Sequence, residues 1–109
     1  MKVMIAVKEN AGLDSELDSR FGRAAYFLVY DTEEEKVLSI VENAFKNEDS
    51  GAGIKTGAFV IENGCRTVIG AHTGPKLSEI LREAKVTMIA ETEGTAREAL
   101  ERYNDQLEG

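Results

Sequence analysis

The chain has 109 residues and a formal net charge of -7, with 20 acidic side chains against 13 basic ones. That length suits one globular domain over residues 1–109, and a hydrophobic content of 42% is sufficient for a buried core. The acidic balance disfavours a polyanionic partner such as DNA unless basic groups gather locally. The single cysteine, Cys65, excludes an internal disulfide, a CxxC pair and a cluster cage of four cysteines from one chain.

Targeting signals and membrane spans are not expected. No apolar run approaches the ~20 residues that a membrane-spanning helix needs. The opening stretch MKVMIAVKEN lacks the length and the cleavage pattern of a signal peptide. We therefore expect a cytoplasmic protein that binds neither a membrane nor nucleic acid.

The first half of the chain predicts three strands. Residues 2–7 and 25–31 are short apolar runs rich in β-branched or aromatic side chains. Residues 37–44 follow a charged turn, EEEK, at 33–36. A turn this short predicts that the second and third strands pair as an antiparallel hairpin.

After residue 53 the hydrophobic period becomes helical. Ile54, Ala58 and Ile61 recur at i, i+4 and i+7, so we predict a helix with these residues on its apolar face. The pair Asn63 and Gly64 supplies its C-terminal stop.

The rest of the chain alternates strands and helices. A strand over 67–71 precedes a helix with Pro75 near its first turn, and a strand over 86–90 follows. The last helix is predicted to begin near Thr95, where Thr95 and Glu98 are spaced as a capping box.

This order of elements predicts a layered α/β domain with a mixed five-stranded sheet. The right-handed crossover rule makes the fourth and fifth strands parallel to their predecessors, with helices covering the sheet. Three connections then open at one sheet edge, namely residues 8–23, 45–53 and 72–74. Two of them exceed the ~4–6 residues typical of compact domains, and long loops are often functional.

Basic side chains and glycines are concentrated on these connections. The basic residues are Arg20, Arg23, Lys55 and Lys76, and the glycines are Gly51, Gly53 and Gly74. Helix N-termini at the same edge add N–H donors and partial positive charge, and glycine permits close approach to the backbone. We infer an anion-accepting pocket. The structural alternative is that the arginines are solvated, the glycines cap helices, Gly22 permits a tight turn and Phe21 plugs the loop onto the core.

His72 ends the fourth predicted strand, where it is either a metal ligand or a hydrogen-bonded edge histidine. Cys65 begins the same strand, and an extended chain separates the two backbones by roughly 23 Å. One mononuclear metal therefore cannot bind both side chains. We interpret Cys65 as a packing residue.

The sequence gives little support to catalysis. The strands at 2–7 and 67–71 carry no carboxylates that could hold two metal ions, and nothing marks a nucleophile elbow. The stretch GAGIKT at 51–56 lacks the full GxxxxGK[ST] spacing of a phosphate loop. We therefore expect a binding protein and no enzyme.

Three motifs, in order and spacing, carry a resemblance to a known family. They are SRFGRAAYFLVYDTE at 19–33, GAGIKTGAFVIENG at 51–64 and TVIGAHTGPKLSEIL at 67–81. Together they resemble the dinitrogenase iron-molybdenum cofactor biosynthesis family, the group of NifX, NafY and the NifB C-terminal domain, over nearly the whole chain. The resemblance implies a three-layer α/β/α, ribonuclease H-like fold without nuclease activity.

The resemblance also implies a function. Family members that act in nitrogenase assembly bind the iron-molybdenum cofactor or its iron-sulfur precursor and pass it between proteins. By this resemblance the chain is a non-catalytic carrier of an anionic metallocluster, with cluster donor and acceptor proteins as partners. Arg20 and Arg23 are then expected to hold the cluster by charge-assisted hydrogen bonds, with His72 as the direct ligand. The other expected binding residues are Phe21, Gly22, Gly51, Gly53, Lys55, Thr56, Thr73, Gly74 and Lys76.

Two other functions stay open at this point. The same helix N-termini suit a regulatory module that binds a nucleotide or another small anion. An enzyme of unknown reaction is the third alternative.

Overall fold

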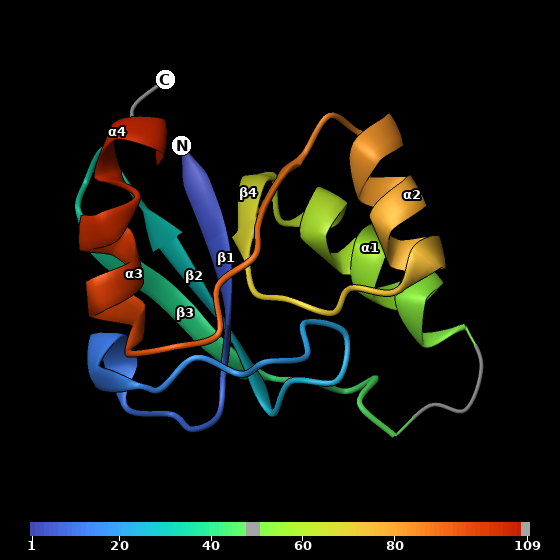
Figure 1. Ribbon diagram of the computed structural model, residues 1–109, viewed down its shortest axis with the longest axis horizontal. Coiled ribbons are helices and arrows are strands. Elements are labelled where there is room, and N and C mark those ends of the chain that lie inside the picture. Colours follow the sequence, from blue (N-terminus) through green and yellow to red (C-terminus); the bar gives the residue numbers. More distant parts are fainter. Residues whose placement is uncertain (48–50, 108–109) are drawn as a thin grey trace.

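The computed structural model of the chain describes residues 1–47 and 51–107, and the helices lie on both sides of a central sheet (Figure 1). The strands are β1 (Lys2–Val7), β2 (Tyr26–Asp31), β3 (Lys36–Glu42), β4 (Cys65–Ile69) and β5 (Thr87–Ile89). The helices are the short 3-10 helix η1 (Gly12–Asp14), then α1 (Ala52–Glu62), α2 (Pro75–Glu83), α3 (Ala96–Arg102) and α4 (Asn104–Leu107). The bounds of the strands differ from the predicted ones by at most two residues at either end.

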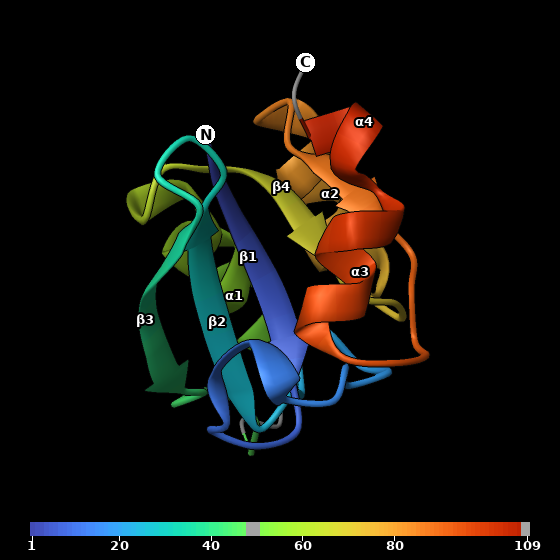
Figure 2. The ribbon, with the colours of Figure 1, turned by 90° about the vertical axis from the view of Figure 1, so that its left-hand side faces the viewer.

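The sheet has the predicted mixed topology. Its strand order is β3-β2-β1-β4-β5, and Figure 2 shows the first four strands in this order across the sheet. β2 pairs antiparallel with both β1 and β3, whereas β4 pairs parallel with both β1 and β5. β1, β3, β4 and β5 therefore point the same way. The connections that follow β1, β3 and β4 leave from one edge of the sheet, as the crossover rule predicts.

The central strand β1 is buried on both faces, and its side chains point alternately to the two faces of the sheet. Met4 and Ala6 belong to the hydrophobic cluster that α1 and α2 cover. Val3, Ile5 and Val7 belong to the cluster that α3 and α4 cover. The domain therefore has two cores in three layers, with the sheet between two pairs of helices (Figure 1).

The predicted apolar face of α1 is not its buried face. Ile54 and Ile61 are 51% and 47% exposed, and the buried residues of the helix are Thr56, Gly57 and Val60. The reason is the close approach of α1 to α2, since a Cβ atom at Gly57 would lie only 2.7 Å from Cγ2 of Ile80. A helix interface this tight selects small residues, so the large apolar side chains of α1 do not mark its core side.

Two neighbouring substitutions test this assignment. Val60→Ala is expected to lower the free energy of unfolding by about 2 kcal/mol, because it truncates a fully buried side chain. Ile61→Ala, at the next position, is expected to change it by less than about 1 kcal/mol because the side chain is half exposed. Urea denaturation of both variants measures the difference, and an equal loss would contradict the observed orientation of the helix.

The C-terminal helical segment differs from the prediction in one respect. Its capping box is confirmed, since Oγ1 of Thr95 accepts the N–H of Glu98 and the Glu98 side chain accepts the N–H of Thr95. The predicted single helix is divided at Tyr103 into α3 and the short α4. Within the described ranges, no helix combines the length and the apolar composition required to cross a bilayer.

Candidate functional site

Three segments that are distant in sequence line one cavity of about 440 Å³. They are the loop before β2, the start of α1 and the chain from the end of β4 into α2, which lie to the lower right of the strands in Figure 1. The lining residues are Gly22, Arg23, Gly51, Ala52, Gly53, His72, Thr73, Gly74, Pro75, Lys76 and Leu77. The predicted convergence of the three connections is therefore observed.

Phe21 anchors the first of these segments to the core. Its side chain is 0% exposed, and its ring centroid lies 5.2 Å from that of Phe27. Its backbone N–H donates to the carbonyl of Ala71 at 2.8 Å, next to His72. Gly70 leaves room for this ring, since a Cβ atom there would lie 2.9 Å from Cδ2 of Phe21.

Four of the expected binding residues do not line the cavity, and two of these four are buried. The side chains of Phe21 and Thr56 are both fully buried, and neither residue lines the cavity. Phe21 plugs the loop onto the core, as the structural reading of the sequence allowed, and Thr56 faces inward from α1. Both side chains are therefore buried away from the cavity.

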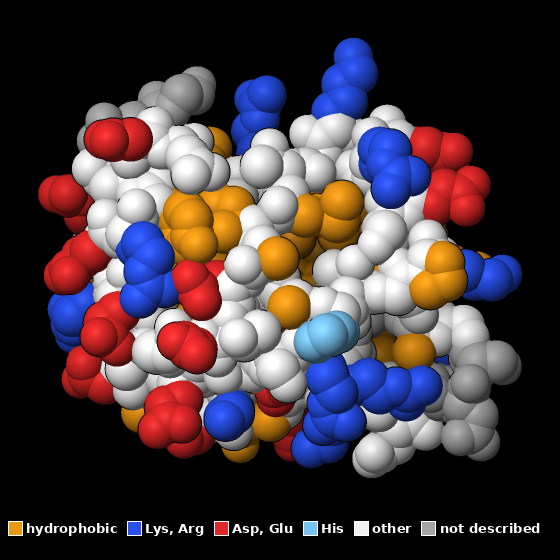
Figure 3. All heavy atoms as spheres, in the orientation of Figure 1, with side chains coloured by type: hydrophobic (Ala, Val, Ile, Leu, Met, Phe, Trp, Pro, Cys, Tyr) orange, Lys and Arg blue, Asp and Glu red, His pale blue; other side chains and the backbone are white. Residues whose placement is uncertain are grey.

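Three of the predicted basic or metal-binding residues meet at the cavity. Arg23, His72 and Lys76 are exposed and line it. Figure 3 shows Lys and Arg side chains gathered beside the histidine, whereas many acidic side chains lie on the left-hand side of the same view. Arg20 and Lys55 are also exposed but lie outside the lining. The local accumulation of positive charge expected in this acidic chain is thus carried by a smaller set of residues.

Arg23 has a fixed partner at the cavity rim. Its NH1 group donates to the carbonyl oxygen of Lys46 at 2.8 Å. A guanidinium group has five N–H donors in a planar fork, so this contact orients the group and leaves other donors able to bind an anion.

The starts of α1 and α2 both face the cavity. Gly51 and Gly74 are their N-cap residues, with φ angles of 78° and 79° that favour glycine. Within the described chain, neither of these N-caps carries a side chain that accepts the first-turn N–H groups. Gly53 brings the two helix starts together, since a Cβ atom there would lie 3.3 Å from the backbone nitrogen of Leu77. The cavity therefore has backbone donors and the positive ends of two helix dipoles on its wall.

His72 lies in the turn that joins β4 to α2. Its φ of 51° places it in the left-handed region, where histidine occurs more often than most non-glycine residues. The next residue, Thr73, shares a hydrogen bond between hydroxyl groups with Ser78 in α2, which fixes the turn. His72 thus presents an exposed imidazole from a defined backbone position.

The donor set does not suit a metal ion held by protein side chains alone. Among residues 1–47 and 51–107, no group of three or more His, Cys, Asp or Glu side chains could hold a metal ion. Cys65 is buried at the other end of β4, and this burial raises the pKa of its thiol to about 11. The thiol is therefore protonated at neutral pH, and the prediction that Cys65 is a packing residue is confirmed by its place in the core.

Two buried polar side chains that the sequence did not single out position the loop before β2. The carboxylate of Asp18 accepts the N–H groups of Arg20 at 3.1 Å and of Ala25 at 3.4 Å. Asn43 donates through its amide to two carbonyls of the same loop. Neither residue belongs to a motif, and Asn43 lies inside the strand predicted over 37–44, so no sequence signal marked its role after the observed end of β3.

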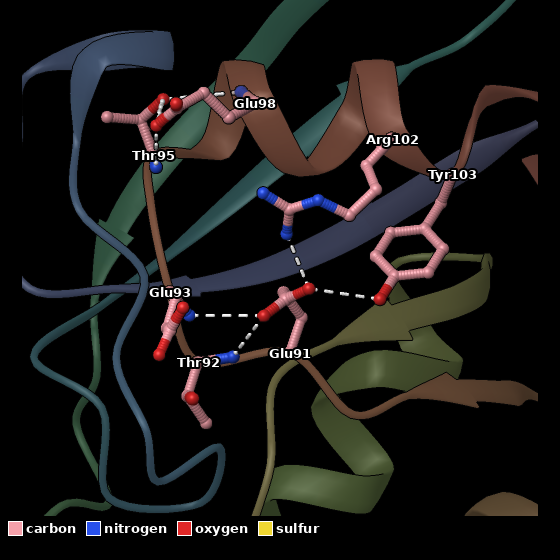
Figure 4. A network of polar contacts seen from close by, with 7 residues as sticks. All are labelled: Glu91, Thr92, Glu93, Thr95, Glu98, Arg102 and Tyr103. Carbon is pink, nitrogen blue, oxygen red and sulfur yellow. Dashed lines mark hydrogen bonds and ion pairs between the residues drawn. The ribbon is translucent and has the colours of Figure 1, made fainter.

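A separate polar cluster follows β5 (Figure 4). The carboxylate of Glu91, whose side chain is 15% exposed, accepts the N–H groups of Glu93 at 3.2 Å and of Thr92 at 2.9 Å. It also accepts the hydroxyl of Tyr103 at 3.0 Å and an N–H of Arg102. These contacts, led by the Glu93 N–H, lower the pKa of Glu91 to about 2. The cluster ties the chain after β5 to α3 and does not line the cavity.

Glu91→Gln is expected to reveal this cluster through the pH dependence of stability. The pKa of the Glu91 carboxyl is lowered in the folded state, so its contribution is complete above its ordinary value of 4.5 and is lost as pH falls toward about 2. At neutral pH the variant should lose about 1–2 kcal/mol of unfolding free energy, because charged hydrogen bonds are weakened.

The comparison of stability curves has a matched control. The difference between wild type and Glu91→Gln should shrink between pH 4.5 and about 2. Glu93→Gln keeps the backbone N–H that binds Glu91 and should give a small difference over the same range. A difference between wild type and Glu91→Gln that stays constant down to the lowest pH would contradict the assigned role of the carboxylate.

Comparison with known proteins agrees with the resemblance drawn from the three motifs. The apo form of the orange protein from Desulfovibrio gigas is 31% identical with a TM-score of 0.87, and the match covers 96% of this chain and 88% of that one. A Thermotoga protein of the DUF35 family, proposed to be a NifB protein, is also 31% identical, with a TM-score of 0.82. This match covers 95% of this chain and 87% of that one.

A search of curated proteins gave no significant match. The family described as dinitrogenase iron-molybdenum cofactor, in contrast, matches residues 1–106. This match spans all five strands and all three segments of the cavity. The chain therefore belongs to the dinitrogenase iron-molybdenum cofactor family.

Proposed function

We propose that the protein is a non-catalytic carrier that binds the iron-molybdenum cofactor or an iron-sulfur precursor as cargo and passes it between proteins. The observation that carries this proposal is the cavity lined by Arg23, His72 and Lys76 at the starts of two helices. Family membership supports a role connected with this cofactor, and the neighbours include an orange protein and a proposed NifB protein.

The cavity suits reversible binding of an anion. The side chains of Arg23 and Lys76 supply positive charge, and the first-turn N–H groups of α1 and α2 supply donors that the N-cap residues Gly51 and Gly74 do not cap with a side chain. A cluster held in this way is retained mainly by charge and hydrogen bonds, with the imidazole of His72 as its direct ligand from the protein. Few coordinate bonds then need to break when the cargo passes to an acceptor protein.

Three finer expectations belong to the same proposal. The three layers are those of a ribonuclease H-like fold without nuclease activity. The carrier acts in the cytoplasm and meets separate cluster donor and acceptor proteins. Arg20 and Lys55 lie outside the lining, and their expected contribution to binding stays a prediction.

Titration under argon with iron-molybdenum cofactor extracted from a nitrogenase tests the proposal. Arg23→Ala and Lys76→Ala should each weaken binding about tenfold, the loss expected when one charge-assisted hydrogen bond is removed. Arg66→Ala is the control, because Arg66 is an exposed arginine near the other end of β4. His72→Ala should also shift the charge-transfer absorption of the bound cluster, since it removes a ligand and not only a charge. Wild-type affinity in all three cavity variants would refute the site.

A second function has one observation in its favour. The described residues offer no group of three metal-ligating side chains, which suits a metal-free anion as well as a cluster. Under this alternative the protein is a regulatory module that binds a nucleotide or another small anion on the helix starts. Calorimetry with nucleotides and inorganic phosphate separates the two, because tight binding without a metal favours the module. An enzymatic role would be supported only by turnover in an activity screen.

A further inference from the structure

We infer that Asn43 is a positioning residue for the cargo site and acts through Arg23; this inference rests on the proposed function. Asn43 directly follows β3 and its side chain is nearly inaccessible, with 3% exposed. Its Nδ2 group donates to the carbonyls of Gly22 at 3.1 Å and of Ala24 at 2.9 Å. Its Oδ1 atom accepts the N–H of Phe45 at 2.9 Å. One buried amide therefore joins the loop before β2, which lines the cavity, to the segment that follows β3.

These contacts fix the backbone on both sides of Arg23. Gly22 and Ala24 are its neighbours in the chain, and both of their carbonyls are held by the same Nδ2 group. The backbone N–H of Asn43 also donates to the carbonyl of Ala25 at 3.0 Å. The direction in which the Arg23 side chain leaves the loop is thus set by Asn43 and not by the loop alone.

Asn43 also fixes the group that orients the Arg23 guanidinium. The carbonyl that accepts from NH1 of Arg23 belongs to Lys46, one residue after Phe45. Because Oδ1 of Asn43 holds the N–H of Phe45, both ends of the Arg23–Lys46 hydrogen bond are attached to the Asn43 side chain. The contacts form a closed ring from Asn43 through Arg23 and Lys46 back to Asn43.

This ring has a consequence for binding. An arginine that is already oriented loses less conformational freedom when it binds an anion than one that moves freely. Breaking the ring at Asn43 should therefore weaken cargo binding even though Asn43 does not line the cavity. A purely structural staple would instead change stability without acting through Arg23.

Asn43→Asp breaks the ring selectively. The substitution replaces the Nδ2 donor with an oxygen that repels the carbonyls of Gly22 and Ala24, and it keeps the acceptor for the N–H of Phe45. Asn63→Asp is the matched control, because its Nδ2 group also donates to a backbone carbonyl, that of Phe59 at 2.8 Å, at the far end of α1. If Asn43→Asp does not fold, Asn43→Ala removes the same donors without placing a charge in the interior.

The binding experiment is a double-mutant cycle with iron-molybdenum cofactor under argon. Asn43→Asp should weaken binding about tenfold, and Asn63→Asp should leave it unchanged. In the Arg23→Ala background the Asn43 substitution should have almost no further effect, because the group through which it acts is gone. Full additivity of the two losses, or wild-type affinity in folded Asn43→Asp, would overturn the inference.

A readout without cargo separates this inference from the proposed function. In the wild-type protein the Arg23 side-chain N–H signals in nitrogen-15 NMR spectra should exchange slowly with water, and in Asn43→Asp they should exchange faster. If wild type does not bind the cofactor but this change is seen, the proposed function fails while the positioning role of Asn43 stands. If exchange at Arg23 is unchanged, Asn43 does not position it.

Discussion

Phe21→Ala is expected to lower the free energy of unfolding by about 3–5 kcal/mol, the range for truncating a fully buried phenylalanine. The ring is 0% exposed and packs against Phe27, with the backbone at Gly70 pressed against its edge. The space left by the ring cannot close easily, because the backbone at Gly70 and the ring of Phe27 lie against it. Urea denaturation followed by circular dichroism measures the loss.

Phe45→Ala is the matched control for this prediction. Phe45 is partly buried and contacts the ring of Phe59 edge-on at a centroid distance of 6.3 Å. Its truncation should cost roughly half as much, because less apolar surface is lost from the interior. A loss for Phe21→Ala no larger than that for Phe45→Ala would show that Phe21 does not anchor the loop.

Phe21→Ala is also expected to affect the candidate site. The N–H of Phe21 is bonded to the carbonyl of Ala71, and the next residues along the two segments are Gly22 and His72 at the cavity. Loosening this contact should therefore weaken cargo binding in molecules that are still folded. Phe21 thus supports the candidate site through its packing, since its side chain is buried and does not line the cavity.

The topology could be predicted because it follows from the order of the strands and helices and from general rules for connecting them. A charged four-residue turn between two apolar runs predicts a hairpin, and the crossover rule fixes the direction of β4 and β5. From these directions the meeting of the loop before β2, the start of α1 and the turn at 72–74 follows without knowledge of any side chain. The shared location of Arg23, His72 and Lys76 at one cavity could be predicted in this way.

The buried face of α1 could not be predicted by the same reasoning. The hydrophobic period selects large apolar residues, whereas the helix is buried on the side of Gly57 because another helix approaches closely there. The inward direction of Thr56 has the same origin. Asn43 escaped prediction for a different reason, since the two carbonyls that its amide binds, those of Gly22 and Ala24, lie on a distant segment whose proximity only the folded chain establishes.

The acidic chain and the basic cavity are compatible because charge acts locally. Interactions between exposed charges fall off within a Debye length, about 8 Å at physiological ionic strength. Many acidic side chains lie on the left-hand side of Figure 3, away from the histidine and its basic neighbours. The net charge of -7 therefore does not cancel the positive field at the cavity.

Gly57→Val is expected to lower the free energy of unfolding by about 3 kcal/mol, at the upper end of the range for overpacking a core. Even the Cβ atom would lie 2.7 Å from Cγ2 and 3.2 Å from Cβ of Ile80, so α1 and α2 must separate. Separation would also move the helix starts at Gly53 and Leu77, which line the cavity. We therefore expect weaker cargo binding together with the loss of stability.

A control and a rescue make the Gly57 prediction specific to the helix interface. Ala58→Val introduces the same side chain one position later on an exposed part of α1, where only helix propensity opposes it and the expected cost is below about 1 kcal/mol. Ile80→Ala removes the Cγ2 and Cδ1 atoms that a side chain at position 57 would strike. The double variant should therefore be more stable than the sum of the two single losses predicts. Simple additivity would mean that the clash with Ile80 is not the cause, and the close packing of α1 on α2 would then not explain which face of α1 is buried.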